Sequence, residues 1–381
     1  MVLFISTFTL VYGLLHGYFL WKARRAFAFT STLRWVVGPF ILIMIFAPFL
    51  VRLLERWGYE LPAQALGYAG FTWMGFLFLL LSASLVEDGY RLAVRAAEFV
   101  MRRRLRSWVF PRRRTFLALA LLAAGITFYG YLEALGIRSE HVTIMTSKLP
   151  SGVGRFRIVQ ISDVHLGLMI REGRLRRILE KVHDAKPDML VSTGDLVDSQ
   201  MDNLTPLADM FREIAPRHGK FAITGNHEFY AGLDRSLAFM HRAGFTILRG
   251  EAREITPWLT IAGVDDPAGS RHGAEGGMPE KELLSKVPPG HFTLLLKHRP
   301  FVDDLSHRSW DLQLSGHTHK GQIFPFSLVM KLMYPIDAGL LALPGGSSLY
   351  VSRGAGTWGP PIRFLAPPEV TVIELVGYAS S

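Results

Sequence analysis

The distribution of apolar residues divides the chain into two dissimilar parts. Four apolar stretches occupy residues 2–21, 35–54, 65–86 and 115–136. Each is close to the roughly 20 residues that a helix needs to cross about 30 Å of hydrocarbon. Trp21, Trp35, Trp57 and Trp108 lie near the ends of these stretches, where interfacial aromatic residues occur. The pattern predicts a membrane domain with four transmembrane helices over residues 1–137.

The second part, residues 138–381, alternates short apolar runs with amphipathic segments. The predicted strands cover residues 141–147, 156–162, 189–193, 220–224, 259–264, 292–297, 312–314, 349–352 and 370–375. The predicted helices between them cover residues 173–186, 205–215 and 235–243. Strands that alternate with helices indicate an α/β sheet. We therefore expect a second, α/β domain over residues 138–381.

The charge is distributed as unevenly as the hydrophobicity. Residues 1–137 hold 15 basic and 6 acidic residues, a net charge of +9, whereas residues 138–381 carry a net charge of only +1. A basic surplus confined to the apolar part predicts membrane orientation rather than nucleic-acid binding. The loops around residues 22–34 and 87–114 are rich in Lys and Arg, so they are expected in the cytoplasm. This makes the chain an integral protein of the plasma or inner membrane, with residues 138–381 outside the cytoplasm.

Composition excludes several classes of protein. Hydrophobic residues make up 49% of the chain and charged residues 19%. These values exclude wholesale disorder and argue against a purely cytosolic enzyme. The chain has no cysteine, which excludes disulfides, thiolate zinc sites and iron–sulfur clusters.

Side chains suited to metal binding follow five of the predicted strands, at the point where each strand ends. They are Asp163, His165, Asp195, Asn226, His298, His317 and His319. Ligands bind at the carboxyl ends of strands in open α/β sheets, so these loops are expected to meet at one rim. Imidazole favours transition ions over magnesium, and seven ligands are too many for one tetrahedral zinc. With one bridging carboxylate, the set suits two divalent ions about 3.5–4 Å apart.

Each of these short motifs occurs alone in ordinary turns, but five together at strand ends favour a site. The chain lacks a G-x-S-x-G elbow, an H-E-x-x-H pair and a phosphate-binding G-x-x-x-x-G-K-S/T loop. Two classes besides an enzyme remain open. One is a non-catalytic, metal-dependent binding module, and the other is a transporter accessory that uses the four spans.

The five blocks resemble the signature of calcineurin-like metallophosphoesterases. They are Asp163-Val164-His165, Gly194-Asp195-Leu196-Val197-Asp198, Gly225-Asn226-His227-Glu228, His298 and Gly316-His317-Thr318-His319. The match spans about residues 155–376. The resemblance implies an α/β fold, a four-layer αββα sandwich around a dinuclear site. Residues 316–322, 350–354 and 367–369 further resemble a membrane-associated branch that includes proteins related to UDP-2,3-diacylglucosamine hydrolases.

The resemblance also implies a role for each site residue. Asp163, His165 and His319 would bind the first metal, Asn226, His298 and His317 the second, and Asp195 would bridge them. His227 would contact the phosphate or the leaving group, while Glu228 and Asp198 would orient side chains or loops. Branch members commonly have Gly where this chain has Lys320, which either contacts an anionic substrate or points into solvent. The two ions would be manganese, iron or zinc.

The implied reaction is hydrolysis of a phosphomonoester, phosphodiester or pyrophosphate. Two divalent ions would acidify a bridging water, the resulting hydroxide would attack phosphorus, and His227 would stabilise the leaving oxygen. Residues 323–334 form an apolar run directly after the ligands, either a lip that admits a lipid or a helix packed in the core. Because the membrane helices would hold the α/β domain at the bilayer, we expect the substrate to be a lipid-linked or membrane-surface phosphate. A UDP-2,3-diacylglucosamine-type pyrophosphohydrolase of lipid A synthesis is the alternative, but its substrate is expected in the cytoplasm.

Overall fold

Contacts within the chain divide it into two units. The computed structural model describes residues 2–27, 30–198, 204–303 and 308–378. The N-terminal unit comprises Met1–Leu132 with Gly359–Ile362, and the C-terminal unit comprises Glu133–Trp358 with Arg363–Ser381.

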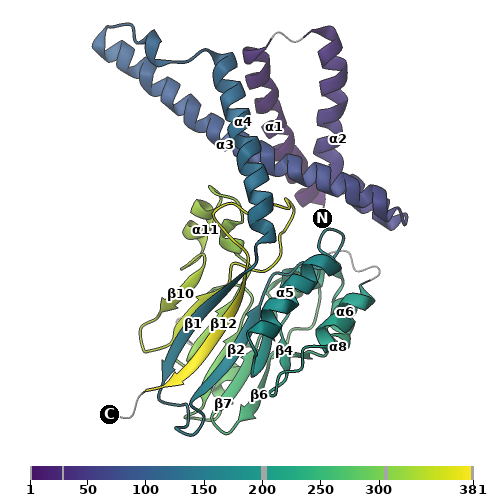
Figure 1. Ribbon diagram of the computed structural model, residues 1–381, viewed down its shortest axis with the longest axis vertical. Helices are drawn as coiled ribbons and strands as arrows, with labels where there is room; N and C mark the ends of the chain where they lie inside the picture. Colours follow the sequence, from purple (N-terminus) through teal and green to yellow (C-terminus); the bar gives the residue numbers. More distant parts are fainter. Residues whose placement is uncertain (1, 28–29, 199–203, 304–307, 379–381) are drawn as a thin grey trace. The chain divides into compact units, whose positions relative to one another are not determined.

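The N-terminal unit consists of long helices (Figure 1). They are α1 (Val2–Ala26), α2 (Ser31–Arg56), α3 (Glu60–Met101) and α4 (Arg112–Leu135), with a single 3₁₀ turn, η1 (Arg106–Trp108). Within the described residues, three segments are long and apolar enough to cross a membrane: Trp35–Arg56, Glu60–Met101 and Arg112–Leu135. The helix α1 is not among them, so the expectation of four spans is met for three of the four stretches.

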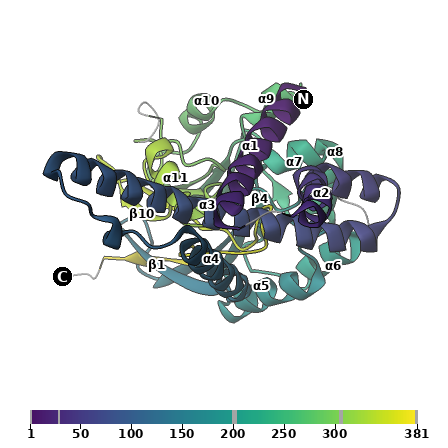
Figure 2. The same ribbon diagram turned by 90° about the horizontal axis from the view of Figure 1, so that it is seen from above.

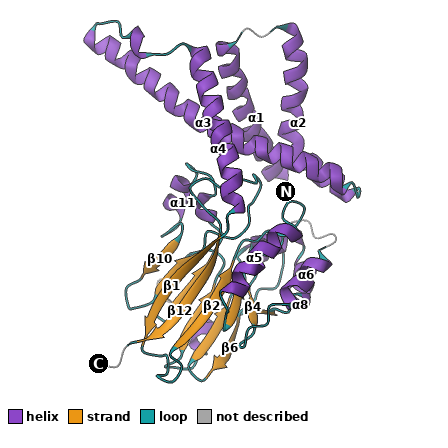
Figure 3. Ribbon diagram, viewed as in Figure 1, coloured by secondary structure: helices purple, strands orange, loops and turns teal. Residues whose placement is uncertain are grey.

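The C-terminal unit contains two six-stranded sheets, drawn in orange in Figure 3. The first has the order β1-β12-β2-β3-β4-β5 and the second β10-β11-β9-β8-β7-β6. The strands are β1 (Arg138–Thr146), β2 (Arg155–Ile161), β3 (Met189–Ser192), β4 (Lys220–Ala222), β5 (Thr246–Ile247), β6 (Glu251–Thr256), β7 (Leu259–Gly263), β8 (Phe292–Leu296), β9 (Leu312–Ser315), β10 (Gly339–Ala342), β11 (Ser348–Val351) and β12 (Glu369–Gly377). The helices are α5 (Glu172–Asp184), α6 (Thr205–Arg212), α7 (Asn226–Ala231), α8 (Leu233–Arg242), α9 (Ala268–Arg271), α10 (Glu280–Ser285), η2 (His319–Gly321) and α11 (Ser327–Met333).

Three apolar clusters hold these elements together. One lies between the sheets and joins side chains such as Ile158 of β2 and Leu294 of β8. Another packs α5, α6 and α8 on the outer face of the first sheet through residues such as Ile178 and Phe211. A smaller cluster packs α10 on the second sheet. Figure 2 shows α5 and α10 on opposite sides of this unit. The predicted α/β class is confirmed, in the form of two packed sheets with helices outside them.

Strand direction explains where the polar loops meet. Strands β2, β3, β4 and β5 are mutually parallel, as are β7, β8, β9 and β11. The buried faces of such strands require near-continuous apolar sequence, as in Phe292–Leu296, where every residue is buried. Their carboxyl ends lie at one edge of each sheet, and the polar blocks follow β2, β3, β4, β8 and β9.

Candidate metal centre

Backbone hydrogen bonds continue the pairing of β2 and β3 beyond the strands themselves. The N–H of Asp163 donates to the carbonyl of Gly194 at 3.0 Å, and the N–H of His165 donates to that of Asp195 at 3.0 Å. Leu166 and Val197 then form an isolated parallel bridge. The two loops are thereby held side by side, so that their carboxylates and imidazole occupy one buried region.

Five of the predicted ligands adopt a backbone conformation that most residues avoid. The φ angles are 51° at Asp163, 55° at His165, 51° at Asp195, 70° at His317 and 48° at His319. The left-handed region costs a residue other than glycine on the order of 1 kcal/mol. Such strain persists only where the surrounding structure fixes it, and it is concentrated at functional sites.

Two glycines allow the loops to approach one another closely. A Cβ atom on Gly316 would lie 1.9 Å from Ser162 Oγ and 2.2 Å from Asp163 Oδ2. A Cβ atom on Gly225 would lie 2.2 Å from Asp195 Oδ1. Any side chain at these positions would overlap a carboxylate of the site, which explains why glycine begins both the Gly225-Asn226 and the Gly316-His317 blocks.

The predicted ligands gather in two adjoining groups. In the first, His319 Nε2 lies 3.1 Å from His165 Nε2 and 3.4 Å from Asp163 Oδ1. In the second, His298 Nε2 lies 3.2 Å from His317 Nδ1. Within each of the groups Asp163/His165/His319 and Asp195/His298/His317, the potential ligand atoms all lie within 4.8 Å of one another. Both groups can therefore hold a metal ion.

Asp195 lies between the two groups. Its Oδ2 is 3.9 Å from His165 Nε2 in the first group and 3.3 Å from His298 Nε2 in the second. Its Oδ1 accepts a hydrogen bond from the backbone N–H of His227 at 2.8 Å. One carboxylate oxygen is thus fixed by the backbone, while the other faces both groups.

Asn226 supplies an independent test of whether the region fits a cation. Its Oδ1 is buried and has no hydrogen-bond partner among the described residues. Buried polar oxygens are nearly always satisfied, so an orphaned amide carbonyl requires an explanation. A carbonyl oxygen is a good ligand for a divalent cation. The residues present therefore fit the metal-binding role that the motif implies.

Comparisons with known proteins agree with this geometry. The family model for calcineurin-like phosphoesterase matches residues 156–321. An uncharacterized metallophosphoesterase of Aquifex aeolicus is 44% identical over 250 residues, which are 65% of this chain and 95% of that protein. The chain belongs to the calcineurin-like phosphoesterase family. It is accordingly a metal-dependent phosphoester hydrolase.

Two further relatives bear on the N-terminal helices. One matches more of the chain than the C-terminal unit alone, and the other is named a transmembrane protein. An uncharacterized metallophosphoesterase of Helicobacter pylori is 33% identical and covers 78% of this chain and 79% of its own. A transmembrane protein with metallophosphoesterase domain from Danio rerio is 34% identical, covering 69% of this chain and 63% of its own. Together with the three apolar helices, these relatives indicate that this phosphoesterase is associated with a membrane.

Burial and charge set the protonation of the phosphoesterase site. Burial lowers the pKa of His165 to about 4 and that of His317 to about 3, and it also lowers the pKa of His319. These rings are neutral at pH 7 and offer lone pairs. Burial opposes the protonation of His298, but Asp195 outweighs it and raises the pKa of His298 to about 10. A bound cation would displace that proton, because metal ligands bind deprotonated.

His227 lies beside the two groups with one ring nitrogen occupied. Its Nδ1 is 2.9 Å from Asp198 Oδ1, and its ring meets that of His165 edge to face at 4.5 Å. Burial disfavours the charged ring, but Asp195 and Asp198 outweigh burial and raise the pKa of His227 to about 9. The protonated ring donates Nδ1–H to Asp198, which leaves Nε2–H free to act as a donor.

Glu228 fastens two of the ligand loops to each other. Its Oε2 accepts from the N–H groups of Asp195 at 2.9 Å and Gly225 at 2.6 Å. Its Oε1 accepts from Leu196 at 2.8 Å and Val197 at 3.3 Å. Burial and the charge of Asp195 raise the pKa of Glu228 to about 7. The carboxylate therefore joins the loop that carries Asp195 to the loop that carries Asn226.

Arg363 is a site residue that the sequence analysis missed. Its side chain is 0% exposed. Its Nη2 donates to His319 Nδ1 at 2.9 Å and to the Gly356 carbonyl at 2.6 Å, while Nη1 donates to the Arg353 carbonyl at 2.8 Å. Burial lowers the pKa of Arg363 to about 9. A lone Arg between Ile362 and Phe364 gives no sequence signal for this role, because only the fold brings it to His319.

Lys320 shares the turn η2 with His319. Its backbone is left-handed, with a φ of 52°, and its N–H donates to Thr318 Oγ1 at 3.2 Å. The side chain is partly exposed. A contact between Lys320 and a substrate remains a prediction.

Proposed function

We propose that this phosphoesterase holds two divalent ions and hydrolyses the phosphate ester of an amphiphilic substrate at a membrane surface. The observation that carries the dinuclear part is the position of Asp195 Oδ2, within 3.9 Å of one ligand group and 3.3 Å of the other. A single oxygen shared by two groups suits a bridging carboxylate. Manganese, iron and zinc all suit these mixed imidazole and carboxylate ligands.

Different residues of the chain have different roles in ester hydrolysis. Divalent ions in such a site supply a nucleophile at neutral pH and neutralise phosphate oxygens. His227, protonated and oriented through Asp198, donates a proton from Nε2 to the departing oxygen. Glu228 and Arg363 touch no reacting atom, and they act by holding the loops and His319 in position.

Turnover of bis-p-nitrophenyl phosphate by the full chain in detergent with manganese tests the dinuclear hydrolase. Asp195→Asn should lower both the bound manganese and the rate by at least about a hundredfold, because it removes the shared charge. Asp209→Asn is the matched control, since Asp209 pairs with Arg242 on the surface. Full turnover with one metal per chain, or turnover that Asp195→Asn leaves unchanged, would contradict the assignment.

The helix α11 supports the amphiphilic substrate. It begins eight residues after His319, and none of its residues is buried. Leu332 is 88% exposed, and Leu328, Val329 and Met333 are exposed as well. The alternative that residues 323–334 form a core helix is therefore wrong for α11. An exposed apolar helix of this kind suits contact with lipid.

The variant Leu328→Ser/Leu332→Ser separates lipid binding from chemistry. We expect kcat/KM for a long-chain phosphatidate in mixed micelles to fall about tenfold, while kcat/KM for bis-p-nitrophenyl phosphate stays unchanged. Val153→Ser changes an exposed apolar residue elsewhere and serves as the control. Equal losses on both substrates would assign α11 a structural role instead.

Membrane orientation is part of the proposal. Arg112, Arg113 and Arg114 precede the apolar part of α4, and this basic cluster supports a cytoplasmic position for this end of α4 and an extracytoplasmic one for the C-terminal unit. This holds whether or not α1 forms a fourth span. Because the chain has no cysteine, Ser151→Cys and Ser107→Cys can be labelled singly with an impermeant maleimide. Only Ser151→Cys should react in intact cells, and the reverse would overturn the orientation.

A further inference from the structure

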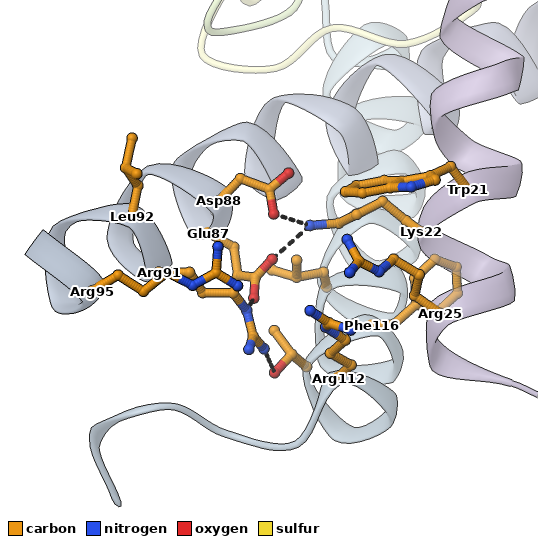
Figure 4. A pocket seen from close by; sticks show the side chains of 12 residues that line it. Trp21, Lys22, Arg25, Glu87, Asp88, Arg91, Leu92, Arg95, Arg112 and Phe116 are labelled. Carbon is orange, nitrogen blue, oxygen red and sulfur yellow. Dashed lines mark hydrogen bonds and ion pairs between the residues drawn. The ribbon is translucent and has the colours of Figure 1, made fainter. Parts of the chain in front are cut away.

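A second charged pocket lies in the N-terminal unit, far in sequence from the phosphoesterase motifs. It has a volume of about 250 Å³ and is formed by α1, α3 and α4 (Figure 4). Five of its lining residues are basic, namely Lys22, Arg25, Arg91, Arg95 and Arg112, while Glu87 and Asp88 are acidic. It has none of the histidines that mark the metal centre.

The two carboxylates are already used by two of the cations. Lys22 Nζ lies 2.6 Å from Glu87 Oε2 and 2.7 Å from Asp88 Oδ1, as the dashed lines in Figure 4 show. Arg91 also pairs with Glu87, and its Nη2 donates to the Phe110 carbonyl at 2.9 Å. Lys22, Arg91 and the two carboxylates therefore balance one another's charge without a ligand.

Three guanidinium groups remain around the pocket. Among the residues that the structure describes, no carboxylate forms an ion pair with Arg25, Arg95 or Arg112, although Glu87 lies near enough to attract Arg112. Arg25 lies over the ring of Trp21 at 4.6 Å. Arginines that converge on one cavity repel one another unless an anion lies between them. The planar donor fork of arginine matches the oxygens of a phosphate.

The remaining wall is apolar, and its place along the helices matches a bilayer interface. It consists of Trp21, Leu92, Phe116 and Leu119, and the one further lining residue, Thr115, accepts a hydrogen bond from Arg91 Nη2 at 3.3 Å. The pocket joins the C-terminal end of α1, the start of α4 and the part of α3 that follows its apolar segment. These are the helix ends next to the basic loops, where the headgroups of a leaflet lie.

We propose that this pocket binds the phosphate of an anionic phospholipid headgroup. The guanidinium groups of Arg25, Arg95 and Arg112 contact the phosphate, while the apolar wall contacts the first carbons of the acyl chains. The ligand is bound and not hydrolysed, because the described lining offers no metal ligands besides Glu87 and Asp88, which are engaged by cations. The site is separate from the phosphoesterase centre and does not depend on the function proposed for it.

Native mass spectrometry of the full chain tests this site. The protein is exchanged into detergent with phosphatidylglycerol or phosphatidylcholine, and a third sample receives inorganic phosphate without lipid. We expect retention of phosphatidylglycerol but not phosphatidylcholine. Removing a cation near such a headgroup weakens binding about fivefold, so Arg95→Gln/Arg112→Gln should weaken phosphatidylglycerol binding about 25-fold.

Two further variants keep the result interpretable. Arg103→Gln/Arg104→Gln removes the same charge from the exposed loop outside the pocket and should retain the lipid. Arg95→Lys/Arg112→Lys keeps the charge and tests folding, and it should bind more strongly than the Gln pair. Equal loss in the pocket and loop variants would overturn the proposal, since the lipid would then follow overall charge. Adducts of inorganic phosphate without lipid retention would replace the lipid by a soluble phosphate, and no adduct of either kind would exclude a phosphate site.

Discussion

Replacing Glu228 by Gln tests whether the ligand loops depend on one buried carboxylate. The substitution preserves shape and volume but exchanges one acceptor oxygen for an NH₂ group. The four N–H donors that surround Glu228 come from Asp195, Leu196, Val197 and Gly225. A glutamine can accept from one pair of these donors only. The other pair would face an NH₂ group, which is itself a donor.

The number of donors that lose an acceptor sets the size of the effect. Each buried N–H that loses its acceptor costs about 1–3 kcal/mol, so two cost about 2–6 kcal/mol. The same substitution removes the buried charge that raises the pKa of Glu228 from 4.5 to about 7, which recovers about 3 kcal/mol at pH 8. At about 2–4 °C of melting temperature per kcal/mol for a unit of this size, the net fall is at most about 12 °C. The loops that carry Asp195 and Asn226 would also separate. Residues that orient metal ligands change metal affinity by about 10–100-fold, and we expect Glu228→Gln to lie in that range.

The assay is thermal unfolding of the full chain in detergent, combined with manganese titration at pH 8. At that pH Glu228 is ionised, because its pKa is about 7. Glu374→Gln is the matched control, since Glu374 of β12 pairs with Arg157 of the neighbouring β2 in a partly exposed ion pair and should change stability by under about 1 kcal/mol. If Glu228→Gln melts within 2 °C of the parent chain, about the smallest shift expected for 1 kcal/mol, and binds manganese equally well, the reasoning is refuted.

Three other changes test the site from different sides. Asp195 and Asp198 raise the pKa of His227 to about 9, so the ring loses its proton as the pH rises toward that value. We therefore expect kcat/KM to fall near pH 9. If the pH–rate profile of His227→Ala shows the same alkaline fall, another group titrates. Arg363→Lys should release manganese about tenfold more readily, measured by dialysis against a chelator, because lysine cannot reach His319 Nδ1 and the carbonyls together. Gly316→Ala should abolish metal binding, because its Cβ would meet carboxylate and hydroxyl oxygens, whereas Gly173→Ala on α5 has open space and should keep the metal content of the parent chain.

Much of the site was predictable because its chemistry is local in sequence. Each of the blocks around Asp163, Asp195, Asn226 and His317 directly follows a run of buried apolar residues, and parallel strands bring such ends together. Three edge strands were not predicted, namely β5, which is only two residues long, and β6 and β10. The burial of β6 and β10 is mixed or alternating, so the sequence of β6 (Glu251–Thr256), with three charged residues, carries no apolar run to mark it. Pairing with β7 and β11 supplies what their own sequences do not.

The sequence by itself determined the two-part organisation, the α/β class and the set of ligand types, because hydrophobic periodicity and strand-end motifs are properties of short segments. The tertiary structure decided everything that depends on contacts between distant segments. It turned Asp195 Oδ2 toward both ligand groups, brought the buried Arg363 onto His319 across 44 residues, and exposed α11 instead of packing it. It also gathered arginines from three helices around one pocket. Such placements arise from packing and hydrogen bonding of the whole fold, which no local pattern encodes.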